Sequence, residues 1–175
     1  MTAQPVTLDA LRRYAVARSL FEPRPLVEAV KKLGYLQADP IRAPARAQDL
    51  ILRHRVNDYR ADDLEKKYAS LPLVEDSIYN YGFFHRDELA LLHPRTVSPR
   101  WLDFMAEHAA LRRAVLRYLK DHEHAHPRDL EKALASGGRV NGWGGSSSAT
   151  TLLLEGLHRE GRVHVQRRDA GIRVY

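Results

Sequence analysis

Apolar positions in the first half of the chain recur at helical spacing over short segments that proline and glycine interrupt. Thr7 can cap a first helix, Pro25 can open a second, and Gly34 can end it. The helices are expected at residues 7–19, 25–32, 44–55 and 61–69, and a strand at 73–79. This half therefore predicts helices first and β structure after them.

One apolar stripe at helical spacing predicts a single long helix in the second half. Its members lie four, three, four and four residues apart: Phe104, His108, Leu111, Val115 and Leu119. Pro127 can begin a short second helix that ends near Ala135, and the serines at 146–148 can cap a third that ends at Gly161. The second half thus predicts three helices in succession.

The last fifteen residues alternate between apolar and polar positions, which is typical of a β-hairpin. One side is expected to carry Val163, Val165, Ile172 and Val174, and the other Arg162, His164, Gln166, Arg173 and Tyr175. Residues 167–171 are expected to form a basic tip between the two strands.

Short helices followed by a hairpin are the element order of a winged helix-turn-helix, and the first half has a looser version of that order. The prolines at 94 and 99 mark a boundary between two modules, residues 1–94 and 95–175. We expect a mainly α chain with small β hairpins, an α+β fold, arranged as tandem winged helix-turn-helix modules. Such modules also serve as protein–protein adaptors, so the fold alone leaves the function open.

Composition narrows the possible functions. The 175 residues include no Cys, which excludes disulfides, thiolate nucleophiles and Cys-ligated metal sites. No apolar run approaches the roughly 18 residues of a membrane span, and we expect a soluble, cytoplasmic protein. The net charge is +6, with 14 basic and 13 acidic residues in 1–94 against 14 and 9 in 95–175. The second half is therefore the expected docking surface for a polyanion.

Gln37, Ala38 and Asp39 precede a proline, which favours extended backbone. Because side chains two positions apart in extended chain point the same way, the Gln37 amide and the Asp39 carboxylate can converge on one water molecule. Asp39 could orient that water and accept its proton. The alternative interpretation is structural, with Asp39 as a helix N-cap and Gln37 as a surface residue.

The run Gly34 to Leu50 (GYLQADPIRAPARAQDL), the following RHRVNDY at 53–59, and Gly142-Trp143 resemble the winged-helix DNA glycosylases of the AlkZ and YcaQ type. That family excises alkylated bases, unhooks interstrand crosslinks, and carries a catalytic motif of Gln, an apolar residue, then Gln or Asp. The resemblance implies that Asp39 activates or electrostatically supports the attacking water while Gln37 positions it. It also implies a DNA repair enzyme that needs no cofactor.

Two departures from the family pattern are expected. An aromatic-x-His element should follow the first module's strand, but residues 79–84 read YNYGFF. The family is also longer, with a third winged helix and a β-barrel, so this chain is expected to be a fragment or a minimal relative.

Basic residues near the motif and in the second module are the candidate DNA contacts. Arg42, Arg46 and Arg53 follow Asp39 at helical spacing and predict one stripe of phosphate contacts, unless they form a solvated face partly neutralised by Asp49. The full set of expected DNA-binding residues is Arg42, Arg46, Arg53, Arg55, Thr151, His158, Arg159, Arg167 and Arg168.

No metal site is predicted. Three alternating histidines, His122, His124 and His126, could face one ion from an extended loop, but such alternation also occurs in polar linkers. Trp143 is expected to anchor the third helix rather than to stack on bases.

The favoured hypothesis is a monofunctional glycosylase that removes N7- or N3-alkylated purines from double-stranded, alkylated or crosslinked DNA in the nucleoid, with no metal or organic cofactor. A non-catalytic DNA-binding regulator and a protein–protein adaptor are the alternatives. The sequence leaves the lesion and the oligomeric state open.

Overall fold

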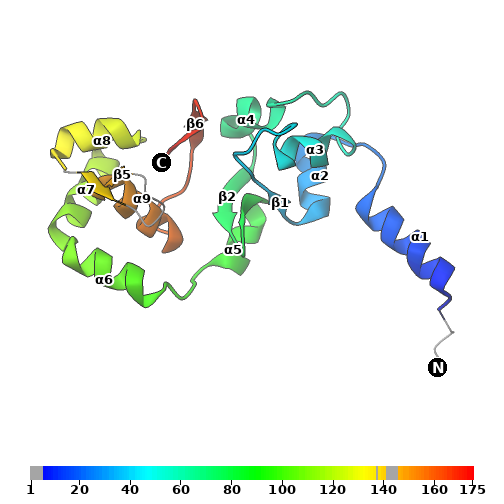
Figure 1. Cartoon of the computed structure of the whole chain (residues 1–175), viewed down its shortest axis with the longest axis horizontal. Coiled ribbons are helices and arrows are strands. Elements are labelled where there is room, and N and C mark those ends of the chain that lie inside the picture. The colour runs from blue at the N-terminus through cyan, green and yellow to red at the C-terminus, as the bar shows by residue number, and fades with distance from the viewer. Residues whose placement is uncertain (1–5, 137, 141–145) are drawn as a thin grey trace.

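The computed structural model describes residues 6–136, 138–140 and 146–175, and its fold is α+β, as expected (Figure 1). Gly142 and Trp143 lie outside the described residues. The α-helices are α1 (Leu8–Ser19), α2 (Leu26–Leu33), α3 (Ala47–Arg53), α4 (Asp63–Lys67), α5 (Leu89–Leu92), α6 (Pro99–Glu107), α7 (Ala109–Asp121), α8 (Pro127–Leu134) and α9 (Ala149–Arg159). Two 3-10 turns are η1 (Tyr68–Ser70) and η2 (Arg86–Glu88). The strands are β1 (Leu36–Gln37), β2 (Leu73–Ser77), β3 (Tyr81–His85), β4 (Gly138–Val140), β5 (Ser146–Ser148), β6 (Arg167–Asp169) and β7 (Ile172–Val174).

Local capping signals place the first two helices where the sequence predicts them. The Thr7 hydroxyl accepts a hydrogen bond from the Ala10 amide (3.2 Å) at the start of α1. Gly34 ends α2 with φ +74°, a backbone conformation that favours glycine. α1 is exposed along its whole length and projects from one end of the molecule (Figure 1).

The next two helices are shorter than predicted. α3 begins at Ala47, because Arg46 has extended backbone, and it ends at Arg53. α4 begins at Asp63, because Asp62 has left-handed backbone with φ +68°, which no helix accommodates. Side chains that are evenly spaced in the sequence between residues 40 and 47 therefore do not share one helical face.

A three-stranded antiparallel sheet occupies the centre of the molecule in the order β1-β3-β2. β3 pairs with β1 through Leu36↔Phe83 and Gln37↔Gly82, and with β2 from Leu73↔His85 to Ser77↔Tyr81. β2 ends at Ser77, two residues before the predicted end, so residues 78–80 form the connection to β3.

The single long helix predicted from the 104–119 stripe is wrong. His108 leaves helical geometry (φ −104°, ψ 28°) and separates α6 from α7. Its ring stacks on Phe104, with ring centroids 4.4 Å apart, and its Nδ1 lies 3.1 Å from the Phe104 carbonyl oxygen. The side chain therefore holds the end of α6, and the apolar stripe continues onto a second helix.

The end of the chain is a hairpin, but its strands and faces differ from the prediction. Residues 167–169 are strand rather than tip, and the turn is Ala170-Gly171, both with positive φ. Tyr175, predicted on the polar side, is buried and exchanges backbone hydrogen bonds with Ala125 (2.8 and 3.1 Å). A second difference is that Ser148 both caps α9, as predicted, and ends β5, which pairs with β4.

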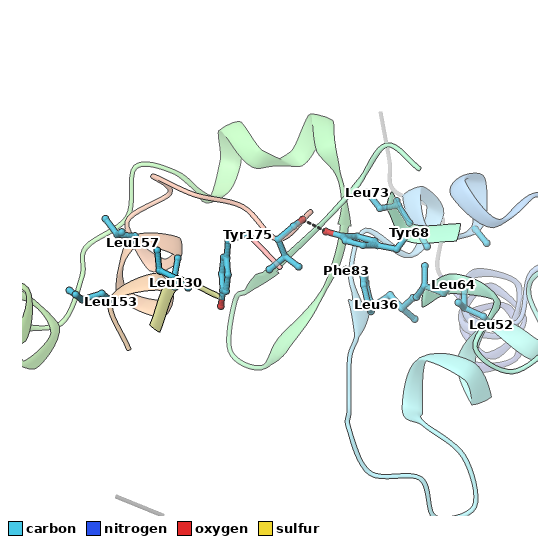
Figure 2. Packing of buried hydrophobic residues seen from close by; sticks show 14 of the residues in the cluster. Leu36, Leu52, Leu64, Tyr68, Leu73, Phe83, Leu130, Leu153, Leu157 and Tyr175 are labelled. Carbon is cyan, nitrogen blue, oxygen red and sulfur yellow. Dashed lines mark hydrogen bonds between the residues drawn. The ribbon is translucent and has the colours of Figure 1, made fainter. Parts of the chain in front are cut away.

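Buried leucine and aromatic side chains form the core on both sides of this hairpin. Figure 2 shows Leu36, Leu52, Leu64 and Phe83 near Tyr68, while Leu130, Leu153 and Leu157 gather near Tyr175. The Tyr68 hydroxyl donates to the Val165 carbonyl (2.9 Å), a bond between the two groups (Figure 2).

The outer edge of β2 is closed by side chains from both halves of the chain. At Glu75 the backbone amide donates to the Tyr68 hydroxyl (3.1 Å), and the carbonyl lies 2.9 Å from Nε2 of His158. The Glu75 carboxylate is 1% exposed and pairs bidentately with Arg168, with Nε 2.9 Å from Oε1 and Nη2 2.7 Å from Oε2. Arg168 thus neutralises the buried carboxylate, while Tyr68 and His158 hydrogen-bond the backbone groups of the open strand edge.

Removing Arg168 should cost about 3 kcal/mol of unfolding free energy, because a buried carboxylate would lose its partner. Urea unfolding of Arg168→Met measures this. Arg167→Met is the matched control, since Arg167 forms an ion pair with the partly exposed Asp169 and a hydrogen bond with the exposed Gln166, and it should change stability by less than about 0.5 kcal/mol. Equal effects of the two variants would contradict a stabilising role for the buried pair.

Stability should also fall on mild acidification because of His158. Burial lowers the pKa of His158 from 6.5 to about 4, with Arg173 and His164 acting in the same direction, while Asp76 and the hydrogen bond to the Glu75 carbonyl oppose them. The folded state thus holds the neutral ring, so this contribution is complete above pH 6.5 and is lost as the pH falls from 6.5 to 4. Between pH 7 and 5 the loss should be about 2 kcal/mol.

Urea unfolding at the two pH values tests this expectation. His158→Gln, which keeps a hydrogen-bond donor, should remove about that much of the pH dependence, while His124→Gln at an exposed position should leave it intact. An unchanged pH dependence in His158→Gln would contradict the assignment.

Candidate functional site

The Gln37-Ala38-Asp39 segment runs along the sheet in extended form, as predicted. Gln37 is paired with Gly82, and the Ala38 amide donates to the Tyr81 carbonyl (2.8 Å). Leu36 and Ala38 pack toward the core, so the alternation of extended chain directs Gln37 and Asp39 to the opposite face, where both are half-buried.

The surface beside Gln37 is formed by the ring of Tyr35, which lies across Gly82. A Cβ atom on Gly82 would be 2.2 Å from a ring carbon of Tyr35 and 2.6 Å from the Leu36 carbonyl oxygen. The Tyr35 hydroxyl donates to the Tyr81 carbonyl (3.2 Å), which fixes the ring in place. Position 82 therefore requires glycine, because any side chain would displace the strand that carries the motif.

Two hydrogen bonds hold Asp39 in position. Its backbone amide donates to Oε1 of the buried Gln48 (2.9 Å), and its Oδ1 accepts the Ile41 amide (2.8 Å) in an Asx turn. The N-cap interpretation of Asp39 is wrong, because the next helix begins at Ala47 after Arg46. Asp39 nevertheless has a structural role in the turn.

Hydrogen-bonding capacity remains at the surface of this segment. Among the residues that the structure describes, the second carboxylate oxygen of Asp39 and the side-chain amide of Gln37 have no hydrogen-bond partner. A fixed carboxylate beside a group that both donates and accepts can bind and polarise a water molecule, or stabilise a positive charge.

Comparison with models of protein families matches residues 30–175 to the family described as DNA glycosylase AlkZ-like. The chain belongs to this family. No curated protein and no solved structure gives a significant match. Membership of the AlkZ-like family indicates a DNA glycosylase function in DNA repair, with DNA as the substrate.

The match covers the motif and everything after it, whereas α1 lies before its first residue. The AlkZ-like chain has an aromatic-x-His spacing at Phe83-Phe84-His85, which ends one residue after the stretch 79–84. His85 pairs with Leu73, at the end of β3 away from Gln37, and its Nδ1 accepts the Asp87 amide (3.3 Å).

The predicted arginine stripe beside the motif is not one surface. Arg42 pairs with Asp62 (3.2 Å), and Arg46 is largely buried against Glu65. The proposed neutralising residue, Asp49, is itself buried and accepts hydrogen bonds from the Tyr59 hydroxyl and the Asp62 amide.

The two later arginines of this region differ from each other. Arg53 is exposed on α3. Arg55 instead donates from Nε to the Ser19 carbonyl (2.8 Å) and from Nη1 to the Ile51 carbonyl (2.8 Å), which ties α3 to the end of α1. Of the four arginines, Arg42 and Arg53 are the ones on the exposed surface.

The five candidates in the second half also divide by environment. His158 is buried and Arg168 pairs with Glu75, so both contribute to the interface between the two halves. Arg167 pairs with Asp169 (3.0 Å), and the Thr151 hydroxyl lies 3.0 Å from that of Ser148.

Arg159 is the most exposed of the five, and its guanidinium lies 5.4 Å from the centre of the Trp101 ring. Its charge therefore stays on the surface at the end of α9.

The three alternating histidines have separate surroundings. His122 stacks on Tyr118 with ring centroids 3.9 Å apart, and His126 caps α8 by accepting the Arg128 amide (3.1 Å). In the described part of the chain, no group of three or more His, Cys, Asp or Glu side chains could hold a metal ion. None of its helices is long and apolar enough to cross a membrane.

The residues that hold the Gln37-Ala38-Asp39 motif in place were not predicted from the sequence. Gln48 lies inside the run at 34–50 that resembles the family, but only its contact with Asp39 reveals its role. Glu75 and Asp76 carried a usable signal, because two carboxylates in an otherwise apolar strand require buried partners. Asp76 finds them in His93 and Arg95, each 2.7 Å away.

Proposed function

We propose that this chain hydrolyses the N-glycosidic bond of N7- or N3-alkylated purines in double-stranded DNA, with Asp39 and Gln37 as the reacting site. The observation that supports this most directly is the unpartnered oxygen of Asp39, which lies on the same face as the unpartnered amide of Gln37 within the described chain. The buried Gln48 bonds to the Asp39 amide, and pairing with Gly82 fixes the backbone of Gln37.

The chemistry follows from the leaving group. An N7- or N3-alkylated purine carries a positive charge, so cleavage of the N-glycosidic bond returns the electron pair to the base and releases it neutral. Positive charge develops on the sugar as this bond breaks, and the Asp39 carboxylate stabilises it. Water then bonds to the anomeric carbon, and its proton passes to the free oxygen of Asp39.

Each hydrogen bond around Asp39 has a part in this step. The Ile41 amide occupies Oδ1 and the Gln48 side chain holds the Asp39 amide, so the carboxylate is restrained while Oδ2 keeps its capacity to accept a hydrogen bond. The Gln37 amide accepts a hydrogen bond from the same water and orients it toward the sugar. Binding and positioning thus precede proton transfer.

The reaction is proposed to be monofunctional. Residues 34–50 contain no lysine, so no amine in the motif can form a Schiff base with the sugar. Water is then the nucleophile, and an abasic site is the product. Bulky lesions, crosslinks included, fit a half-buried motif on a strand better than a deep pocket, because they can be reached without full base flipping.

DNA is proposed to lie along a surface that includes Arg42, Arg53 and Arg159, the exposed members of the predicted set. We also propose that residues 1–94 and 95–175 are winged-helix modules. Support comes from the order α7, α8, α9, then β6–β7 in the second half, and from the helices that precede the β2–β3 hairpin in the first. Binding of this kind would associate the protein with the nucleoid.

Base release from randomly methylated duplex DNA is the decisive experiment. A glycosylase releases free alkylated purine and leaves heat-labile abasic sites, whereas a regulator binds the same DNA without releasing base. An adaptor does neither.

Duplex binding should weaken steeply as salt rises, because phosphate contacts release counterions. With two to four phosphates neutralised, affinity should fall by about tenfold to a hundredfold between 50 and 200 mM salt. Fluorescence anisotropy with an unmodified duplex measures this. Arg53→Gln and Arg159→Gln should each reduce the slope by about 1, and Lys120→Gln on α7 is a control from the same half of the chain as Arg159. An affinity indifferent to salt would favour the adaptor.

Asp39→Asn should reduce single-turnover excision by a factor of about 100 or more while leaving binding and melting temperature unchanged. Asn keeps the oxygen that accepts the Ile41 amide, so the Asx turn survives and only the charge is lost. Gln37→Ala should lower excision by less, because it removes positioning alone.

Asp58→Asn is the matched control for this substitution, since Asp58 is an exposed carboxylate in the same half of the chain. Normal excision by Asp39→Asn would remove Asp39 from the reaction and leave it a purely structural residue.

A further inference from the structure

The connection between β2 and β3 presents two adjacent large apolar side chains to solvent. Tyr79 is 94% exposed and Ile78 is 65% exposed, and they lie between the polar residues Ser77 and Asn80. Single exposed apolar residues are common, but a hairpin tip is normally polar. Burial in the core therefore does not account for an aromatic ring at this tip.

The tip lies beside the motif because β3 pairs with both β1 and β2. The register Gln37↔Gly82 continues with the bond from the Ala38 amide to the Tyr81 carbonyl, so β1 runs toward the end of the sheet at which β2 and β3 are joined. Ser77 pairs with Tyr81, so Tyr79 is the middle residue of the turn at that end.

Cationic groups flank the base of the tip. Nη1 of Arg95 donates to the Ser77 carbonyl (2.8 Å), and the Arg173 guanidinium lies 3.8 Å from the centre of the Tyr81 ring. Arg95 shares its charge with Asp76, whereas Arg173 forms no ion pair among the described residues. An apolar tip above a cationic base is complementary to stacked bases between phosphates.

We propose that the β2–β3 tip is a wedge that enters the DNA stack next to the lesion, with Tyr79 stacking on a neighbouring base and Ile78 packing beside it. This inference rests on the proposed function, because excision requires the sugar of the lesion to come within reach of Asp39. A ring inserted in the stack would replace the stacking contacts that the displaced nucleotide loses. Tyr79 is a positioning residue and takes no part in proton transfer.

Comparing the excision rates on duplex and single-stranded DNA distinguishes a wedge from a general loss of catalysis. With a defined N7-methylguanine site, Tyr79→Ser should slow single-turnover excision from the duplex by about tenfold or more, but should change the single-strand rate by less than about threefold. Tyr79→Phe keeps the ring and should restore the duplex rate. Tyr14→Ser, the same change at an exposed tyrosine on α1, is the control and should match the unsubstituted protein.

A second measurement needs no catalysis. The probe is a duplex that carries a tetrahydrofuran abasic analogue with 2-aminopurine as its immediate neighbour. Binding should change the 2-aminopurine fluorescence for the unsubstituted protein and for Tyr14→Ser, but not for Tyr79→Ser. No change should appear when the 2-aminopurine lies six base pairs away.

The outcomes distinguish the wedge from the proposed function. Failure of the unsubstituted protein to excise would overturn the glycosylase proposal, and the fluorescence experiment would still decide whether the tip enters the stack. Equal duplex rates or equal fluorescence changes for Tyr79→Ser and Tyr14→Ser would overturn the wedge. So would an equal loss of excision on single-stranded and duplex DNA.

Discussion

The structure depends on how the outer edge of β2 is closed. A three-stranded sheet with an open edge would expose unpaired backbone groups, and this edge also carries a carboxylate with almost no solvent contact. Tyr68, His158 and Arg168 satisfy the amide, the carbonyl and the carboxylate of Glu75 respectively. Since the last two belong to the second half of the chain, the same contacts complete the sheet and join the halves.

That closure reaches the candidate site through β3. β3 pairs with β2 on one side and with β1 on the other, so a sheet fixed at its far edge holds Gln37 and Asp39 at its near edge. Gly82 and Tyr35 make this near edge close-packed. The reacting groups themselves need few contacts, because the strand beneath them is already determined.

The sequence predicts those features that residues within one helical turn determine. Thr7, Gly34 and Ser148 act within one turn of their own positions, and each ends or begins a helix as expected. The extended backbone of the motif was predictable for the same reason, since a proline restricts the residue before it.

Specific side-chain and backbone contacts decided the rest. His108 breaks an apolar stripe by packing on Phe104, four residues before it, whereas Tyr175 is buried by pairing with the distant Ala125. The predicted arginine stripe does not form, because Asp62, just before α4, and Glu65, within it, pair with Arg42 and Arg46. Periodicity assigns side chains to a face, but it cannot say which distant partner that face will meet.

The sequence separation of 93 between Glu75 and Arg168 has a consequence for biosynthesis. A ribosome adds about 5–20 residues per second, so the β2 edge emerges roughly 5–20 seconds before the arginine that closes it has been made. During that interval the nascent sheet presents an unpaired strand beside an unneutralised carboxylate. The charge that is costly to bury in the finished protein would then repel an identical edge on a neighbouring nascent chain, and so protect the protein while it is still incomplete.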